Sequence, residues 1–463
     1  MNATAQTAES YFAAGLEKVQ KGLYKEALDD FSKAIEVDPN FDWVYYNRGT
    51  TYHALGDYQK AIADFNTAIE VNPQDADAYN NRGLSYYRLG NYQQAILDFN
   101  KAIELDEKHA KAYMNRGISY QILADYQQAI LDFTKTIELD SKVAALVYYN
   151  RGVSHEALGV YQNAILDFNK ALELNPKDAE AYFHRGFSYD HIGDNQQAIA
   201  NFNKTIELDS KYVIAYNNRG NSYSKLGENQ KAILDFDKAI ELDPKNAVAY
   251  NDRGNIYGSL GNYQQAILDY TKAIELDPND ASAYINRSIV KNDLGDKYGA
   301  IADWTKAIEL NPHNAVAYSN RGKIKDDLGD KEGAIADYTK AIELNPQKTN
   351  VYSNRGLAKY SLGDNKGAIA DYTKAIELNP HNAKSYYNRG LAKYNLGDNF
   401  GALADFTKVI ELNPHNAVAY SYYCRGLVKQ KLGDNEDACQ DWHKAKELGY
   451  NEAAAMIEEF CKK

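Results

Sequence analysis

An arginine returns along this chain at a nearly constant interval, and that interval constrains the fold more than any other feature. The sequence Tyr-Tyr-Asn-Arg-Gly at Tyr45 to Gly49 recurs as Tyr-Asn-Asn-Arg-Gly at Tyr79 to Gly83, 34 residues later. The arginine occupies Arg48, Arg82, Arg116, Arg151, Arg185, Arg219, Arg253, Arg287, Arg321, Arg355, Arg389 and Arg425. Each interval is 34 residues, except for 35 before Arg151 and 36 before Arg425. A period in this range predicts a solenoid in which each unit packs only on its neighbours.

Composition narrows the classes of protein that fit. The formal net charge is −12 and no run of Lys or Arg occurs, so we expect neither nucleic acid nor an anionic membrane as a partner. No apolar stretch is long enough to span a membrane, and residues 1–20 lack the pattern of a secretory signal peptide. Three cysteines, Cys424, Cys439 and Cys461, lie near the C-terminus. We interpret this odd-numbered group as reduced thiols and expect a cytoplasmic protein.

Thirteen units follow one another when the recurring arginine is placed at position seven. They start at residues 8, 42, 76, 110, 145, 179, 213, 247, 281, 315, 349, 383 and 419. Position four is tyrosine and position twenty is alanine in every unit, position eight is glycine in twelve units, and position twenty-four is always aromatic. Positions four, eight and eleven share one face of a helix, and positions twenty, twenty-four and twenty-seven share a face of a second.

Glycine and proline mark the ends of these two helices. Position fifteen is glycine in twelve units, which predicts a C-cap and a turn, and all nine prolines fall at position thirty-two, after the second helix. Glycine inside a helix costs roughly 0.5–1 kcal/mol relative to alanine, so position eight needs a structural reason. We expect close backbone approach there, with Gly83 facing Ala95 where the two helices cross.

This pattern resembles the tetratricopeptide repeat, whose signature has an aromatic residue at four, Gly at eight, Ala at twenty, an aromatic at twenty-four and Pro at thirty-two. The match covers residues 8–450, with a tail at 1–7 and a capping helix expected at 451–463. The resemblance implies an all-α protein: an α-solenoid, a right-handed superhelix of antiparallel helix pairs. Arginine replaces the family's usual leucine at position seven, and the Asn-Arg-Gly version is similar to repeats of bacterial, particularly cyanobacterial, proteins.

Two sub-families of unit meet near residue 280. Position eleven is Tyr in most early units and becomes Lys from the ninth unit onward, at Lys291, Lys325, Lys359, Lys393 and Lys429. Because the period is unbroken, we interpret the chain as one continuous solenoid with two surface chemistries.

The joints around units four to seven should be the softest. Proline is missing at Glu107, Ser141 and Ser210, and one extra residue lies near 141–145. Hydrogen exchange should therefore be faster there than in units nine to twelve, and uniform protection along the array would contradict this prediction.

Asparagine at position six is the main candidate for a binding function. The resemblance places positions two, five, six, nine, twelve and thirteen on the inner wall of the superhelix. The ladder asparagines, as we call the position-six set, are Asn47, Asn81, Asn115, Asn150, Asn218, Asn286, Asn320, Asn354 and Asn388. A carboxamide can donate to and accept from the backbone of an extended peptide, and the row resembles the asparagine ladder of O-linked N-acetylglucosamine transferases. Alternatively, the amide bonds a neighbouring helix, or duplication copied it without use.

Two polar patches could add selectivity, with solvated surface as the alternative for both. One patch combines Asn217, Asn218, Asn221, Asn251, Asp252 and Asn255. The other contains Asp293, Asp326 and Asp327 and would favour a basic peptide segment.

Arginine seven has a natural partner in the aspartate at position twenty-three, which Asn201 replaces in one unit. We expect a structural ion pair, either within a unit or across a joint.

No spacing typical of a catalytic, metal or phosphate site occurs, so we expect no enzyme, metal or cofactor. The sequence predicts a non-catalytic scaffold that binds extended segments of partner proteins. The alternatives are a targeting or substrate-recruiting subunit of a multi-protein enzyme or assembly complex, and a homo-oligomer that stacks end to end.

Overall fold

The computed structural model describes residues 7–140, 142, 144–412 and 419–461. These residues contain α-helices and no strand, so the all-α fold is confirmed. Of the positions without proline, Ser141 lies outside the described residues, as does most of the expected tail at 1–7.

The chain divides into two compact units, residues 1–242 and 243–463, and each is described by itself. The first holds α1 (Ala8–Gln20), α2 (Tyr24–Val37), α3 (Asp42–Ala54), α4 (Tyr58–Val71), α5 (Ala76–Arg88), α6 (Tyr92–Leu105), α7 (Ala110–Ile122), α8 (Tyr126–Leu139), α9 (Ala145–Ala157), α10 (Tyr161–Leu174), α11 (Ala179–His191), α12 (Asn195–Leu208), α13 (Val213–Lys225) and α14 (Asn229–Leu242). The second holds α15 (Ala247–Ser259), α16 (Tyr263–Leu276), α17 (Ala281–Asp293), α18 (Lys297–Leu310), α19 (Ala315–Asp327), α20 (Lys331–Leu344), α21 (Thr349–Ser361), α22 (Asn365–Leu378), α23 (Ala383–Asn395), α24 (Asn399–Leu412), α25 (Ala419–Lys431), α26 (Asn435–Glu447) and α27 (Ala453–Phe460).

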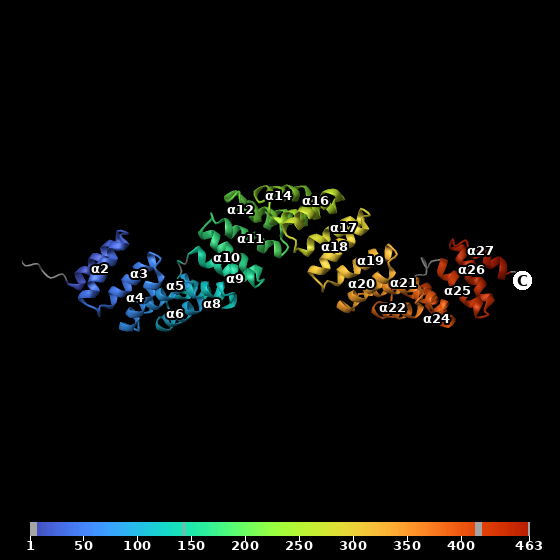
Figure 1. Ribbon diagram of the computed structural model, residues 1–463, viewed down its shortest axis with the longest axis horizontal. Helices are drawn as coiled ribbons and strands as arrows, with labels where there is room; N and C mark the ends of the chain where they lie inside the picture. The colour runs from blue at the N-terminus through green and yellow to red at the C-terminus, as the bar shows by residue number, and fades with distance from the viewer. Residues whose placement is uncertain (1–6, 141, 143, 413–418, 462–463) are drawn as a thin grey trace, which may run out of the picture. The chain divides into compact units, whose positions relative to one another are not determined.

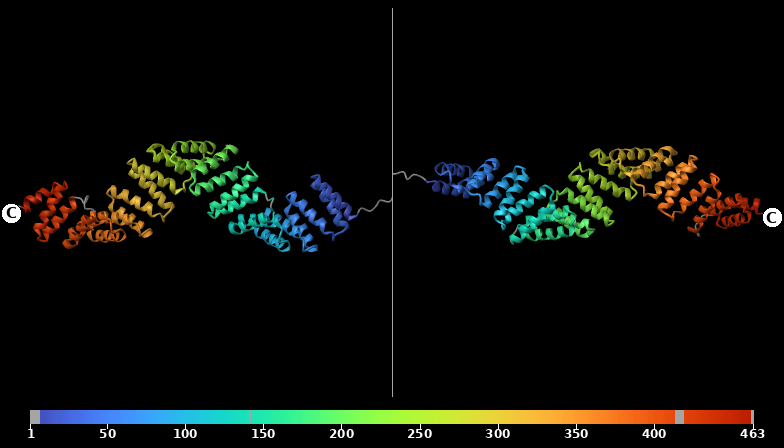
Figure 2. Two further views of the ribbon diagram at one scale, coloured as in Figure 1. Left: turned by 180° about the vertical axis from the view of Figure 1, so that it is seen from behind. Right: turned by 90° about the horizontal axis from the view of Figure 1, so that it is seen from below.

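Within each unit, consecutive helices pack in antiparallel pairs, and each pair packs on the next (Figures 1 and 2). The first helix of every pair starts at the first residue of a sequence repeat. The boundary between the two compact units follows Leu242, whereas the sequence sub-families change near residue 280. A single continuous solenoid therefore stays a prediction.

The turn between the helices of a pair depends on a left-handed residue. The glycines at position fifteen have φ values between 73° and 90°, and Ala124, which replaces glycine once, has φ 61°. Glycine adopts this conformation without steric cost, so the expected turn is confirmed, with the glycine one residue beyond the C-cap of the first helix.

Glycine at position eight makes room for the aromatic ring at position twenty-four. A Cβ at Gly83 would lie 2.8 Å from a ring carbon of Phe99 and 3.1 Å from the carbonyl oxygen of Ala95. The expected approach to Ala95 is present, but the ring is nearer. Phe99 and Ala95 are fully buried, so the core of each pair forms where these three positions meet.

The C-terminal segment folds back and is joined to the last pair by a disulfide. Helix α27 packs on α26 with Ala453 buried, and the Cα atoms of Cys439 and Cys461 lie 5.7 Å apart across a disulfide bond. The prediction of three reduced thiols was therefore wrong for this pair, while Cys424 is a buried free thiol. Sequence spacing did not show the fold-back that brings residue 461 beside residue 439. The cysteine-based argument for a cytoplasmic location is lost, and that location stays a prediction.

Candidate functional site

Arginine seven, which is present from the second repeat onward, links the first helix of its repeat to two partners. Arg48 donates from Nε and Nη2 to the two carboxylate oxygens of Asp64, both at 2.8 Å, within its own repeat. Its Nη1 donates to Ser32 Oγ at 3.1 Å in the preceding repeat, and its guanidinium lies 5.8 Å from the ring centre of Tyr45. The hydrogen bonds to Asp64 raise the pKa of Arg48. The ion pair thus lies within a repeat, and a third bond crosses the joint.

The repeat without an aspartate shows what the carboxylate does. Arg185 Nε donates to Asn201 Oδ1 at 2.7 Å, and Nη1 donates to Asn169 Oδ1. With no carboxylate to offset desolvation, burial lowers the pKa of Arg185. The bonds from Nε and Nη1 are kept in this repeat, but the second bond to position twenty-three is lost together with the counter-ion.

Lysine eleven adds a second cation to the same aspartate in the later repeats. Lys325 Nζ lies 2.9 Å from Asp337 Oδ2, and Arg321 holds the same carboxylate through both oxygens. The equivalent bonds from Lys291, Lys359, Lys393 and Lys429 measure 2.8–3.0 Å. The change from Tyr to Lys therefore alters the packing within a repeat, since these lysines point to the buried aspartate.

The ladder asparagines fall into three groups. Asn81, Asn115 and Asn286 donate across the joint to position five of the preceding repeat, at 2.9–3.1 Å. Asn47 and Asn218 donate to carbonyl oxygens in their own helices. In the part of the chain that the structure describes, the side-chain amides of four others donate to no protein acceptor: Asn150, Asn320, Asn354 and Asn388. Bonding to a neighbouring helix, one of the alternatives above, is therefore what the first group does. The amides of the last group are available to a ligand.

Position five of the preceding repeat accounts for part of this grouping. The amides that cross the joint reach Tyr46, Asn80 and Asn251, whose side chains offer an acceptor. For Asn320 and Asn150 the residue at that position is Ile285 or Met114, which offers no acceptor, whereas for Asn354 and Asn388 it is Ser319 or Ser353. The residue type at position five therefore explains the available amides of Asn320 and Asn150 but does not predict those of Asn354 and Asn388.

Three successive repeats of the second compact unit carry available amides. Asn320, Asn354 and Asn388 lie on α19, α21 and α23 at the same position of each repeat. Asn320 lines two cavities, one of about 450 Å³ with Val316, Ser319 and Asn350, and one of about 200 Å³ with Ile289 and Asp327. An amide between two hollows can hold a peptide backbone while adjacent side chains enter either hollow.

The first polar patch is divided between the two compact units. Asn217 is buried, Asn218 bonds within its helix, and Asn221 is half-buried. In residues 243–463, Asn251 accepts from Asn286, and Asn255 accepts from Tyr270 Oη at 2.9 Å. Asp252 is half-buried and has a bonding partner. Several of these side chains are therefore engaged within the protein.

The second patch is less acidic than the sequence suggests. Asp326 pairs with Lys331 at 2.7 Å, whereas Asp293 and Asp327 are exposed. Asp327 shares its cavity with Lys323. One carboxylate is thus neutralised by its own helix pair.

A buried serine at position ten was missed by the sequence reasoning. Ser188 Oγ donates to Glu156 at 3.2 Å, and Ser222 Oγ donates to Asp190 at 2.9 Å, each bond reaching position twelve of the preceding repeat. Position ten is apolar in residues 243–463, as at Ile256 and Val290. The recurrence of serine inside a helix was the signal in the sequence. These serines join neighbouring repeats through position twelve, in addition to the bonds made by arginine seven.

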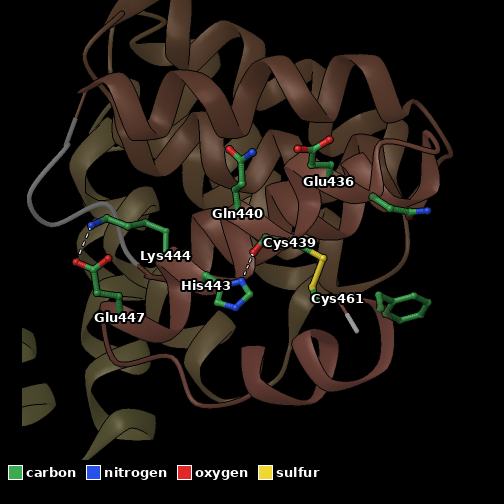
Figure 3. Close-up of a pocket in the computed structure, with 9 residues that line it drawn as sticks. Glu436, Cys439, Gln440, His443, Lys444, Glu447 and Cys461 are labelled. Atoms are coloured by element: carbon green, nitrogen blue, oxygen red, sulfur yellow. Dashed lines mark hydrogen bonds and ion pairs between the residues drawn. A yellow bond between two sulfur atoms is a disulfide. The ribbon is translucent and has the colours of Figure 1, made fainter. Parts of the chain in front are cut away.

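A further cavity of about 940 Å³ lies beside the disulfide on α26 (Figure 3). Lys444 pairs with Glu447 at 2.8 Å, and His443 donates to the Cys439 carbonyl at 2.7 Å. Across the described residues, no group of three or more His, Cys, Asp or Glu side chains could hold a metal ion, and no helix there is both long and apolar enough to cross a bilayer.

These features define a helical repeat protein whose units display one recurring face. Tetratricopeptide repeat models match residues 76–109, 110–143, 145–178, 168–200, 213–246, 247–280 and 383–416. A TPR repeat model also matches residues 15–56, 49–90, 192–227, 327–363 and 356–397. The chain belongs to the tetratricopeptide repeat family, and this membership supports a protein-interaction scaffold.

Solved tetratricopeptide structures resemble parts or all of the chain. YrrB, described as a TPR protein with an unusual peptide-binding site, is 29% identical, with 40% of this chain and 95% of that chain covered and a TM-score of 0.38. A C-terminal part of a repeat protein from Cytophaga hutchinsonii is 22% identical, covering 51% and 96%, with a TM-score of 0.44. Yeast Tom70 is 19% identical, covering 98% and 99%, with a TM-score of 0.38. No curated protein sequence matches the chain significantly.

Proposed function

We propose that this protein is a non-catalytic scaffold that binds extended peptide segments of partner proteins along Asn320, Asn354 and Asn388. The observation that carries the proposal is the recurrence of three available amides at one position of three successive repeats. An extended strand rises about 3.3 Å per residue and presents alternating donors and acceptors, which a row of carboxamides can satisfy.

The flanking cavities support an extended ligand. Val316 lines one cavity and Ile289 the other, so each has an apolar side chain in its wall, and Asn320 lines both. Backbone hydrogen bonds to the amides would hold many sequences, and the cavities would select among side chains.

Replacing Asn320, Asn354 and Asn388 together by alanine should abolish most of the peptide affinity. Each lost hydrogen bond contributes about 1 kcal/mol net, so the Kd should rise by about two orders of magnitude. Linear peptides selected from a displayed library on the full chain serve as probes, and fluorescence anisotropy measures their affinity.

The matched control replaces Asn81, Asn115 and Asn286, whose amides bond within the protein. This variant should lose stability but retain peptide binding at temperatures where it is folded. Wild-type affinity in the first triple variant, with an unchanged circular dichroism spectrum, would refute the proposed site.

A further inference from the structure

A cavity of about 580 Å³ lies in the first compact unit, where α3, α5 and α7 begin. Trp43 and Tyr46 of α3 line it together with Asp75, Asp77 and Asp106. The ladder amides of Asn320, Asn354 and Asn388 are not part of it, so the inference drawn from it is independent of the proposed function.

This cavity occupies the same place in the repeat as the cavity of about 450 Å³ beside Asn320. Trp43 and Val316 each occupy position two of the first repeat that lines its cavity. One repeat later, Asp77 takes the place of Asn350, and Asp106 takes the place of Asn379. The architecture is shared, but carboxylates replace neutral amides.

An exposed tryptophan forms one wall. The Trp43 side chain is 60% exposed and meets the Tyr46 ring edge-on, with ring centres 6.5 Å apart. Tyr46 is held in place by the amide of Asn81, which donates to its hydroxyl at 2.9 Å. The face of an indole attracts a cation more strongly than the other aromatic side chains do.

Carboxylates dominate the rest of the lining. Four aspartates, Asp140 included, and two lysines, Lys108 and Lys111, line the cavity. His109 Nδ1 accepts from the Ala112 amide, so its Nε2 carries the proton and donates to Asp77 at 3.2 Å.

Asp77 nevertheless stays 69% exposed. Burial raises the pKa of the Tyr46 hydroxyl, and the negative charges of Asp77 and Asp75 raise it further. The negative charges of these carboxylates therefore lie close to the aromatic side chains of the cavity.

We propose that this cavity binds a lysine or arginine side chain from a basic segment of a partner protein. The cation lies over the Trp43 indole and faces Asp77 and Asp106. Charge complementarity selects this occupant, since the cavity joins an electron-rich ring to an excess of carboxylates.

The test measures binding of a fluorescein-labelled peptide of alternating lysine and serine to the full chain at low ionic strength. Its counterpart with glutamate in place of lysine should not bind. Trp43→Val, which installs the residue found at the equivalent Val316, should weaken binding about 2- to 5-fold. Asp77→Asn with Asp106→Asn should weaken it by about 3- to 10-fold, and added salt should reduce the wild-type affinity.

The matched control is Glu180→Gln with Asp209→Asn, which removes the same charge at the same two positions of a later repeat. It should bind like the wild type. Equal weakening by both double variants, or wild-type affinity in Trp43→Val and Asp77→Asn with Asp106→Asn alike, would overturn the proposal.

Tryptophan fluorescence gives an independent readout. Trp304 and Trp442 are 2% and 0% exposed, so collisional quenching by acrylamide reports mainly on Trp43. Saturating lysine peptide should protect the emission of the wild type and leave that of Trp43→Val unchanged. Unaltered quenching of the wild type at saturation would place the peptide elsewhere and overturn the assignment.

Discussion

Replacing Asp337 by alanine should lower the free energy of unfolding of its repeat by about 3–5 kcal/mol, because two cations lose a shared buried partner. Asp337 is 4% exposed and holds Arg321 through both oxygens and Lys325 through one. Native-state hydrogen exchange across α19 and α20 measures the loss locally, which suits an array of weakly coupled units.

Asn201→Ala is the matched control, because it removes the same position-twenty-three side chain where no carboxylate exists. Its cost should be about 1 kcal/mol, the typical net value of a hydrogen bond. Equal losses in the two variants would show that the aspartate acts as a spacer and that its charge contributes nothing.

Trp442→Ala should destabilise the C-terminal end by about 3–5 kcal/mol, the usual cost of removing a large buried aromatic side chain. The Trp442 side chain is fully buried, its Nε1 donates to the Tyr423 carbonyl at 3.3 Å, and its ring lies 5.8 Å from that of Phe460. The measurement is hydrogen exchange over α25 to α27, where α27 should lose protection although the disulfide still tethers it.

His443→Ala provides the comparison on the same helix. The His443 side chain is exposed, so its removal should change stability by no more than about 0.5 kcal/mol. Comparable loss of protection in both variants would contradict a specific role for the buried indole.

Sequence periodicity determined the helices because each signal acts over a few residues. The turn at position fifteen needs a left-handed conformation, which glycine adopts, and the ring of Phe99 needs the space that Gly83 leaves. The pairing of arginine seven with aspartate twenty-three was also predictable from charge. Which aspartate it meets was not, because the period places equivalent aspartates on both sides of most of these arginines.

Features without a period were harder to foresee. The Cys439–Cys461 disulfide depends on the fold-back of a segment that occurs once. The differing states of Asn81 and Asn320 depend on a neighbour one repeat away, which Tyr46 and Ile285 illustrate. The cavity at Trp43 combines residues of several repeats, so no single repeat could reveal it.

The way each guanidinium divides its bonds bears on how such a chain can grow or shrink during evolution. Arg48 keeps its counter-ion Asp64 inside one module and extends only to the neutral hydroxyl of Ser32 in the module before. Excision or duplication of a whole module would therefore leave this arginine–aspartate pair intact at the new junction. Array length should vary among relatives with little electrostatic penalty.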